Sequence, residues 1–233
     1  MHNKIFCLYL AWVPLFQSVY CQNIEIINRG LSEFSAEVQF RNAGDVPSHS
    51  NVDGTEYFDE NFVKGEIFTA QSEHYLDIPM RYNVFKDRME VKLADGNIYD
   101  LTDHTKISQI LFKNRTLVYS DFDAGKIKGS GYLFMLYNGK STLYSRYIKL
   151  FVKGVEETNG ITPSLPDKIV DRPREYYIKL TDGIPRIFKS KNDLLDLLNK
   201  RASEMEDFLK KQKLKLNNED DLIKALTYYD SIQ

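Results

Sequence analysis

The sequence predicts an α+β fold, in which an antiparallel β-meander, barrel-like or sandwich-like, is followed by a β-hairpin and two C-terminal helices. Two patterns predict it. Between residues 62 and 151, short runs of β-branched and aromatic residues alternate with Gly, Asn or Asp turns about every ten residues. After residue 190, apolar residues instead recur three or four positions apart, which is typical of amphipathic helices.

The composition is that of an ordinary globular protein. The 233 residues include 31 Lys and Arg against 33 Asp and Glu, and 42% are hydrophobic. A net charge of -2 does not favour binding to nucleic acid, because that binding depends on many cations that contact phosphates. The apolar content is too high for a disordered chain. We therefore expect a globular protein that binds no nucleic acid.

Residues 1–21 are predicted to be a signal peptide. Lys4 precedes an apolar run from Ile5 to Phe16, and polar residues follow it. The run has about 12 residues, whereas a membrane-spanning helix needs about 20. Cleavage after Cys21 predicts export to the periplasm, the cell envelope or the outside of the cell, with no transmembrane segment in the mature protein. Acylation of Cys21, which would anchor the protein to lipid, is the alternative.

Signal cleavage removes both cysteines of the chain, Cys7 and Cys21. A mature chain without thiols forms no disulfide, no iron–sulfur or zinc–thiolate site and no cysteine nucleophile. The hydrophobic core alone must then stabilise the fold.

Residues 22–54 are predicted to be an N-terminal segment and a linker. Alternating runs at 24–27 and 36–40 predict two short strands. Residues 42–55 are rich in Gly, Pro, Ser, Asn and Asp, which predicts a long loop.

Residues 55–153 are predicted to form the antiparallel β domain. The expected strands are 62–69, 75–85, 89–93, 98–101, 107–112, 116–119, 131–137 and 141–151. Turn residues separate several of them, including Lys113-Asn114-Arg115 and Asn138-Gly139. The latter pair predicts a type I′ hairpin, because both residue types tolerate positive φ.

Residues 154–174 contain glycines and prolines with few apolar residues, which predicts a connector. Residues 175–233 then predict a hairpin with strands at 176–180 and 184–189, followed by a helical tail. Ser190 is the expected cap of the first helix and Asn218 that of the second. The apolar stripe of these helices is predicted to pack against the core, and docking of a partner on it is the alternative. It comprises Leu194, Leu198, Ala202, Met205 and Leu209 in the first helix, and Leu222, Leu226 and Tyr229 in the second.

Several short segments resemble a recurring type of exported Gram-negative bacterial protein of unknown function. They are FVKG at 62–65, DIPMRYN at 77–83, RMEVK at 88–92, KNRTLVY at 113–119 and KSKNDLLDLL at 189–198. The likeness covers most of residues 55–230. It implies a signal peptide, a β-rich body and a charged helical tail, and it brings no activity and no site residue with it.

No motif with catalytic or metal-binding spacing stands out. The polar residues that could hold a metal are His74, Asp77, Asp100, Asp103 and His104, with His49 in the linker, but no HExxH spacing brings them together. The visible carboxylate pairs are Asp121 with Asp123 and Asp59 with Glu60. Neighbours on a strand point to opposite faces, so these pairs are weak candidates for glycoside hydrolysis. We expect no metal, no cofactor and no catalytic residue.

The aromatic residues of the strands are the candidate binding site. A β-barrel of this size can hold a small ligand among them, or they can fill its interior. The ligand-binding candidates are Tyr75, Tyr82, Tyr132, Tyr137 and Tyr144. The sequence thus favours a non-enzymatic binding or envelope-associated structural module, whose partner is an unidentified small ligand or an envelope protein. The alternatives are a secreted hydrolase that uses scattered carboxylates and a protein–protein adaptor that uses the C-terminal helices.

Overall fold

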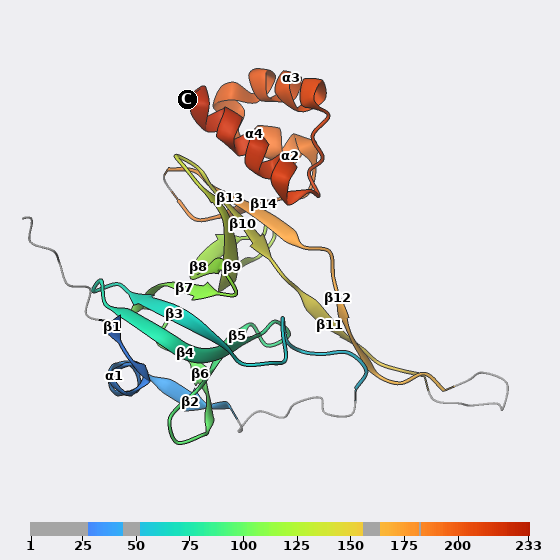
Figure 1. Ribbon diagram of the computed structural model, residues 1–233. Coiled ribbons are helices and arrows are strands. Elements are labelled where there is room, and N and C mark those ends of the chain that lie inside the picture. Colours follow the sequence, from blue (N-terminus) through green and yellow to red (C-terminus); the bar gives the residue numbers. More distant parts are fainter. Residues whose placement is uncertain (1–27, 44–51, 156–163, 182) are drawn as a thin grey trace, which may run out of the picture.

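The computed structural model describes residues 28–43, 52–155, 164–181 and 183–233, and it consists mainly of strands, with helices near both ends of the described chain (Figure 1). The first elements are β1 (Asn28–Arg29), α1 (Leu31–Glu37) and β2 (Phe40–Asn42). The central strands are β3 (Val63–Thr69), β4 (His74–Asn83), β5 (Arg88–Lys92), β6 (Ile98–Leu101), β7 (Ile107–Phe112), β8 (Arg115–Asp123), β9 (Lys128–Asn138) and β10 (Thr142–Arg146). The last elements are β11 (Lys149–Val152), β12 (Lys168–Asp171), β13 (Glu175–Lys179), β14 (Arg186–Phe188), α2 (Lys191–Leu197), α3 (Ala202–Gln212) and α4 (Glu219–Ser231).

Within the described residues, twelve strands form one continuous sheet. Its order is β14-β13-β10-β9-β8-β7-β3-β4-β5-β6-β2, and β1 pairs with β4. The sheet closes on itself, because β14 also pairs with β8, in parallel, at Arg186 and Asp123. Strands β8, β9, β10, β13 and β14 therefore form a five-stranded barrel, with the other strands added on one side. The α+β class with an antiparallel meander and C-terminal helices is confirmed.

Alternation along the barrel strands places their side chains in three separate cores. Phe122, Leu133, Tyr144 and Tyr177 come from four barrel strands and pack together in a small cluster. Their neighbours in sequence face outward. Tyr132 and Phe134 join the core of the β3–β7 region, whereas Leu143, Tyr176 and Phe188 join the core beneath the helices. Because successive side chains of a strand point to opposite faces of the sheet, neighbouring residues of one barrel strand pack in two different cores.

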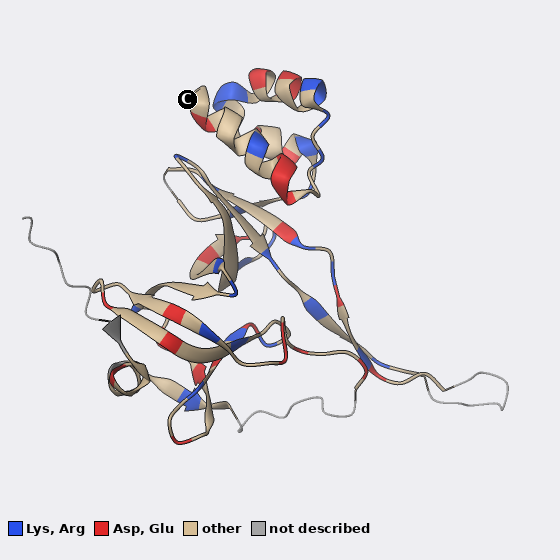
Figure 2. Ribbon diagram, viewed as in Figure 1, with Lys and Arg blue, Asp and Glu red and all other residues tan. Residues whose placement is uncertain are grey.

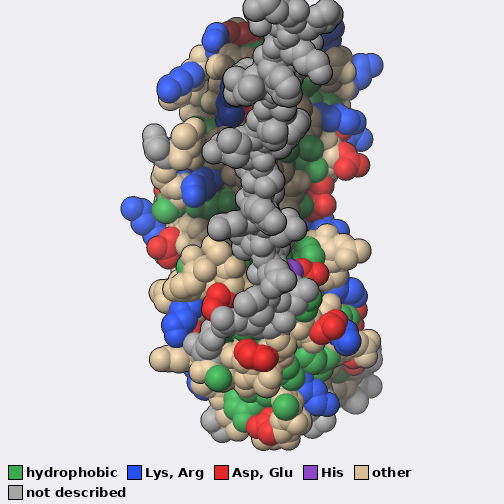
Figure 3. All heavy atoms as spheres, turned by 60° about the vertical axis from the view of Figure 1, so that its left-hand side comes forward, with side chains coloured by type: hydrophobic (Ala, Val, Ile, Leu, Met, Phe, Trp, Pro, Cys, Tyr) green, Lys and Arg blue, Asp and Glu red, His purple; other side chains and the backbone are tan. Residues whose placement is uncertain are grey.

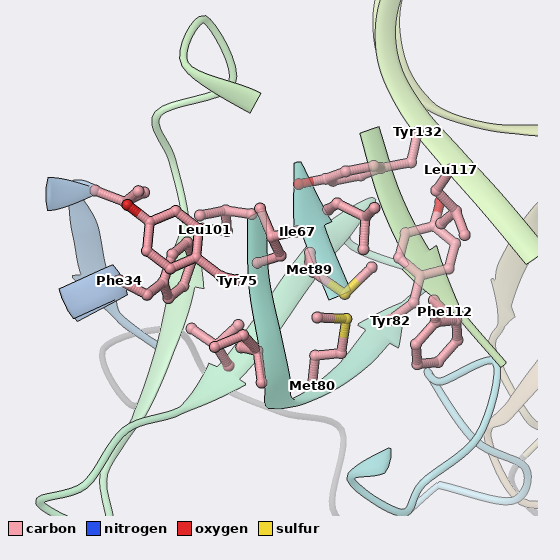
Figure 4. Packing of buried hydrophobic residues seen from close by; sticks show 14 of the residues in the cluster. Phe34, Ile67, Tyr75, Met80, Tyr82, Met89, Leu101, Phe112, Leu117 and Tyr132 are labelled. Carbon is pink, nitrogen blue, oxygen red and sulfur yellow. The ribbon is translucent and has the colours of Figure 1, made fainter. Parts of the chain in front are cut away.

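The largest of these cores lies between α1 and strands β3–β9 (Figure 4). Aromatic rings fill much of it, and they contact one another edge to face. Phe34 of α1 lies 5.1 Å from Tyr75 of β4 between ring centroids, and Tyr82 lies 5.6 Å from Tyr132. Tilted and T-shaped pairs at these distances are favourable beyond the area they bury.

The C-terminal helices cover the outer face of β10, β13 and β14 (Figure 1). Ser190 caps α2 by accepting a hydrogen bond from the Asp193 amide at 3.1 Å, and Asn218 caps α4 in the same way through Asp221. Where the sequence predicted one helix after Ser190, a 3₁₀ turn at Asn199–Arg201 separates α2 from α3, so three α-helices follow the hairpin. This break lets residues of both helices reach the same core. The predicted stripe is buried there, except for the partly exposed Ala202; its buried members are Leu194, Leu198, Met205, Leu209, Leu222, Leu226 and Tyr229.

Asp230 anchors α4 to the turn between β9 and β10. Asp230 is 8% exposed, and its carboxylate accepts hydrogen bonds from the Ser141 amide at 3.1 Å, the Ser141 hydroxyl at 2.7 Å and the Tyr137 hydroxyl at 2.9 Å. A Cβ on Gly139 would lie 2.3 Å from a carboxylate oxygen of Asp230. A larger residue at position 139 would therefore push this carboxylate away from its hydrogen-bond partners.

The structure corrects two local predictions. The predicted strand at 36–40 is divided: residues 36 and 37 end α1, and a strand begins only at Phe40. The helix forms because Leu31, Phe34 and its cap residue Val38 are spaced three and four apart and pack on one side in the core. The type I′ turn was also wrong at Asn138-Gly139, where neither residue has positive φ and three residues separate the paired Asn138 and Thr142. The predicted strand at 24–27 and most of the predicted linker lie outside the described residues.

A two-residue turn with positive φ occurs instead at Lys113 and Asn114, between the paired Phe112 and Arg115. The predicted connector at 154–174 contains β12, which pairs with β11 in a two-stranded ribbon that projects from the barrel (Figure 1).

In the described part of the chain, none of the helices has the length and apolar content needed to cross a membrane.

We expect Asp230→Ala to lower the free energy of unfolding by about 2–4 kcal/mol, because it leaves buried donors on Ser141 and Tyr137 without an acceptor. Denaturant unfolding monitored by circular dichroism measures this. Asp207→Ala is the matched control, since Asp207 is exposed on α3 and should change stability by less than about 0.5 kcal/mol. Equal effects of the two substitutions would contradict the role of Asp230.

Candidate functional site

The five tyrosines predicted to bind a ligand lie in three different cores. Tyr75, Tyr82 and Tyr132 are fully or almost fully buried in the core of β3–β9, where Tyr82 and Tyr132 contact each other. Tyr144 packs inside the barrel, and Tyr137 packs beside the helices. The structure thus brings two of the five together and holds the others apart.

Two of these buried tyrosines surround one carboxylate. The Tyr82 hydroxyl donates to Asp87 at 2.7 Å, and the Tyr132 amide donates to the same carboxylate oxygen at 3.2 Å. Arg146 contacts the other oxygen at 3.1 Å. Burial, and then the charge of Asp87, raise the pKa of both tyrosine hydroxyls well above the ordinary value. Both hydroxyls are therefore neutral at physiological pH.

The residues considered for a metal lie in separate places. His74 contacts Glu66 at 2.7 Å and stacks on Phe68, whereas the ring of His104 stacks on Tyr119. The carboxylates of the set pair with cations: Asp77 with Lys64, Asp100 with Arg41 and Arg88, and Asp103 with Lys106. No group of three potential ligands gathers anywhere in the described ranges, and His49 lies outside them.

The carboxylate pairs considered for hydrolysis have local roles. Asp59 accepts a hydrogen bond from the Asn61 amide and pairs with Lys113. Asp123 accepts from the Gly125 amide at 2.8 Å, which stabilises the turn between β8 and β9. Asp121 pairs with Ser130 of β9 in the ladder between those strands.

A groove at the base of the ribbon gathers cations and aromatic rings. Its first part has a volume of about 270 Å³ and lies between the segment before β3, the β10–β11 junction and the end of β12. Its lining residues include Tyr57, Phe58, Tyr147, Lys149, Arg172 and Arg174. Its second part, of about 580 Å³, reaches the N-terminus of α4 and shares Arg172 and Arg174 with the first. We call the two parts together the ribbon-base groove.

The three cations of the groove have different surroundings. The side chain of Lys149 is only 8% exposed, and its ammonium lies 3.0 Å from Asp171, directly across the ribbon. Arg174 pairs with Glu219 and lies 4.5 Å above the Tyr147 ring. Arg172 is exposed and has no ion-pair partner in the described part of the chain. In the first part of the groove, three cations therefore face one carboxylate, Asp171.

Tyr147 is held edge-on in this groove. Its ring packs between Phe58 and Phe134, each with a centroid 4.9 Å away, and its hydroxyl accepts a hydrogen bond from Arg115 at 3.2 Å. Burial raises the pKa of this hydroxyl, while Arg115 and Arg174 lower it by smaller amounts. The hydroxyl is therefore protonated at physiological pH. It accepts a hydrogen bond from Arg115 and can donate its own hydrogen to a ligand.

A larger cavity, of about 650 Å³, lies between the β8–β9 turn, β14 and α2. Its cations are Lys126, Arg186 and Lys189, and its lining carboxylates are Glu175, Asp193 and Asp196. Since this cavity has three cations and three carboxylates, it attracts an anionic ligand less strongly than the ribbon-base groove does.

Sequence reasoning missed the ribbon-base groove, because its cations come from a predicted strand and a predicted connector. One signal was present. Arg172-Pro173-Arg174 places two cations beside a proline just before an aromatic strand, and Lys149 begins an otherwise apolar strand. Figure 2 shows the Lys and Arg positions along the ribbon and the segment that follows it, and Figure 3 shows a face on which both signs of charge are mixed.

Comparison of the chain with protein-family models, curated proteins and solved structures gives no match.

We expect stability to fall as pH rises above the ordinary tyrosine pKa of 10.0. Unfolded tyrosines lose their protons there, whereas burial raises the pKa of folded Tyr82 and Tyr132, so the folded state binds more protons than the unfolded state. Urea unfolding on either side of this pH, with phenolate absorbance as a second measurement, checks this.

A Tyr82→Phe variant is the control, and its stability should depend less on pH in this range. If the variant and the original protein show the same pH dependence, the raised pKa of Tyr82 is contradicted.

Proposed function

We propose that the protein is an exported, envelope-associated binding module, and that its ligand carries an anionic group that binds in the ribbon-base groove. The observation that supports this most is the placement of Lys149, a cation with a side chain only 8% exposed that lines the groove. Arg172 adds a second cation at the same wall, without an ion-pair partner in the described residues. Export rests on the predicted signal peptide and on the resemblance described above.

The cations of the groove suit a carboxylate or a phosphate. An ammonium donates three hydrogen bonds, and a guanidinium donates two parallel ones to a planar acceptor such as a carboxylate. Asp171 lies 3.0 Å from Lys149, but its own side chain is 77% exposed, so water already competes for that ion pair. A ligand anion that excludes this water would interact with Lys149 more strongly than Asp171 does.

The remaining groups of the groove are held in place before a ligand arrives. Arg174 is positioned by Glu219 and Tyr147, and Tyr147 is positioned by its neighbouring rings. Side chains that are already ordered lose little entropy on binding. Arg174 and the Tyr147 hydroxyl therefore form the wall of the groove, while Lys149 and Arg172 make the direct contacts with the anion.

Citrate serves as a small polycarboxylate probe for this proposal. We expect isothermal titration calorimetry to detect its binding at low salt, and Arg172→Ala to weaken it at least about tenfold, since a charge-assisted hydrogen bond contributes about 1.5–3 kcal/mol. Raising the salt concentration should weaken the binding of the original protein.

Lys126→Ala, which removes a cation of the larger cavity, is the matched control and should bind citrate as the original protein does. Lys149→Ala should also weaken binding, and Arg172→Ala keeps the test valid if the Lys149 variant does not fold. Absence of citrate binding, or equal losses in the Arg172 and Lys126 variants, would overturn the proposed function.

A further inference from the structure

We propose that the anionic ligand is an extended acidic segment of a partner protein, which runs from the ribbon-base groove along one face of the β11–β12 ribbon. This inference rests on the proposed function, because the same groove holds one carboxylate of that segment. The partner segment would alternate acidic and apolar residues. Four observations on the ribbon support it: its apolar face, the cations on that face, its continuity with the groove and the occupied edge of β12.

One face of the ribbon presents an apolar row to solvent. Side chains alternate along β11, so Ile148, Leu150 and Val152 lie on the same face. On β12, Val170 lies directly opposite Leu150. Leu150 is 40% exposed and Val152 is 46% exposed, whereas on the other face Ile169 is buried and Phe151 is 37% exposed. Exposed apolar side chains gathered on one projecting element are typical of an interaction surface.

Two cations, Lys168 in β12 and Arg172 directly after it, flank this apolar row. Lys168 lies opposite Val152, and Arg172 donates its backbone amide to the Ile148 carbonyl at 2.9 Å, so both residues share the face of Leu150. They are four residues apart, which is about 13 Å along a strand. Both are exposed, and neither has an ion-pair partner in the described residues.

The carboxylates of the ribbon are already engaged. Asp167 accepts a hydrogen bond from the Gly154 amide at 2.6 Å, and Asp171 pairs with Lys149. The cations of the apolar face therefore lack acidic partners on the ribbon itself. Acidic side chains on the occupant would complement them, with the spacing that alternate residues of an extended chain provide.

The apolar face and the ribbon-base groove are continuous. Ile148 and Arg172 belong to the face and also line the first part of the groove. A ligand that binds Arg172 in the groove and also reaches Lys168 must span about 13 Å, which is longer than a small metabolite but matches an extended peptide of several residues.

The ribbon already forms an isolated backbone bridge with another segment of the chain, at Asp53. At β12, the Asp53 amide donates to the Asp167 carbonyl at 2.9 Å, and the Ile169 amide donates to the Asp53 carbonyl at 2.8 Å. A Cβ on Gly54 would lie 2.3 Å from the Ile169 carbonyl oxygen, so the two backbones are in close contact. The edge of β12 away from β11 is thus occupied at this point, which leaves the face of the ribbon as the surface for a partner.

A second copy of this ribbon fits the face less well. Its corresponding face carries the same cations, Lys168 and Arg172, and would bring like charges together. An acidic partner avoids this repulsion and satisfies both cations.

The test uses a fluorescently labelled twelve-residue peptide that alternates Glu and Val, with a Lys–Val peptide of equal length as the control ligand. We expect fluorescence anisotropy to show at least about tenfold tighter binding of the Glu–Val peptide than of citrate, and much weaker binding of the Lys–Val peptide.

The variant Leu150→Ser/Val152→Ser should weaken binding of the Glu–Val peptide at least about tenfold and leave citrate binding unchanged, because both substitutions are on exposed positions outside the groove. Lys168→Ala should act in the same direction. Ile127→Ser, at an exposed apolar residue of the β8–β9 turn, is the matched control and should bind both ligands normally.

The outcomes separate this inference from the proposed function. If citrate binds through Arg172 but the ribbon variants bind the peptide as well as the original protein does, the groove holds a small anion and the peptide inference is overturned. If neither ligand binds, both proposals are overturned. If sedimentation shows a dimer that Leu150→Ser/Val152→Ser dissociates, the face serves self-association and the acidic partner is excluded.

Discussion

Closure of the sheet is the constraint on which the rest of the structure depends. At the seam, the Asp123 amide donates to the Pro185 carbonyl at 2.8 Å, and Arg186 of β14 lies beside Asp123 of β8. Once these strands meet, each barrel strand has one face inside the barrel and one outside it. The outside faces remain apolar, so other elements must cover them. The added strands cover one part and the helices cover another, which explains why a single sheet supports three cores.

The same closure positions the ribbon-base groove. The chain leaves the barrel after Arg146 and returns at Glu175, and these two residues are directly paired between β10 and β13. Both ends of the ribbon are therefore fixed by two strands that are paired with each other in the barrel. Tyr147 and Arg174 are the next residues on each side, and they contact each other at 4.5 Å. A binding wall supported in this way by paired strands is more precisely held than one built on a free loop.

The sequence contained most of the fold and little of the candidate site. Local signals predicted the strands, the hairpin and the caps at Ser190 and Asn218, because alternation and capping depend on residues close in sequence. The closure of β14 on β8 could not be predicted, since no short-range pattern records which distant strands pair. Tyr82 and Tyr132 were predicted to be ligand-binding residues, with core filling as the alternative, and both are buried in the core, because residue type alone does not distinguish a ring that fills a core from one that faces a ligand. Lys149 was not recognised, because the residues that line the groove beside it, such as Tyr57 and Asp171, are distant from it in sequence.

The anchor at Asp230 has a consequence for the order of folding. Its hydrogen bonds to Ser141 join residues 89 positions apart, so they form only after the intervening chain has folded back and α4 has reached the turn between β9 and β10. The meander from β3 to β10, by contrast, consists largely of neighbouring hairpins, whose loops close quickly. We therefore expect the meander to collapse first and to expose the apolar outer face of β10 until the helices dock. During that interval the nascent protein would be a client for chaperones, and docking of α4 would end its risk of aggregation.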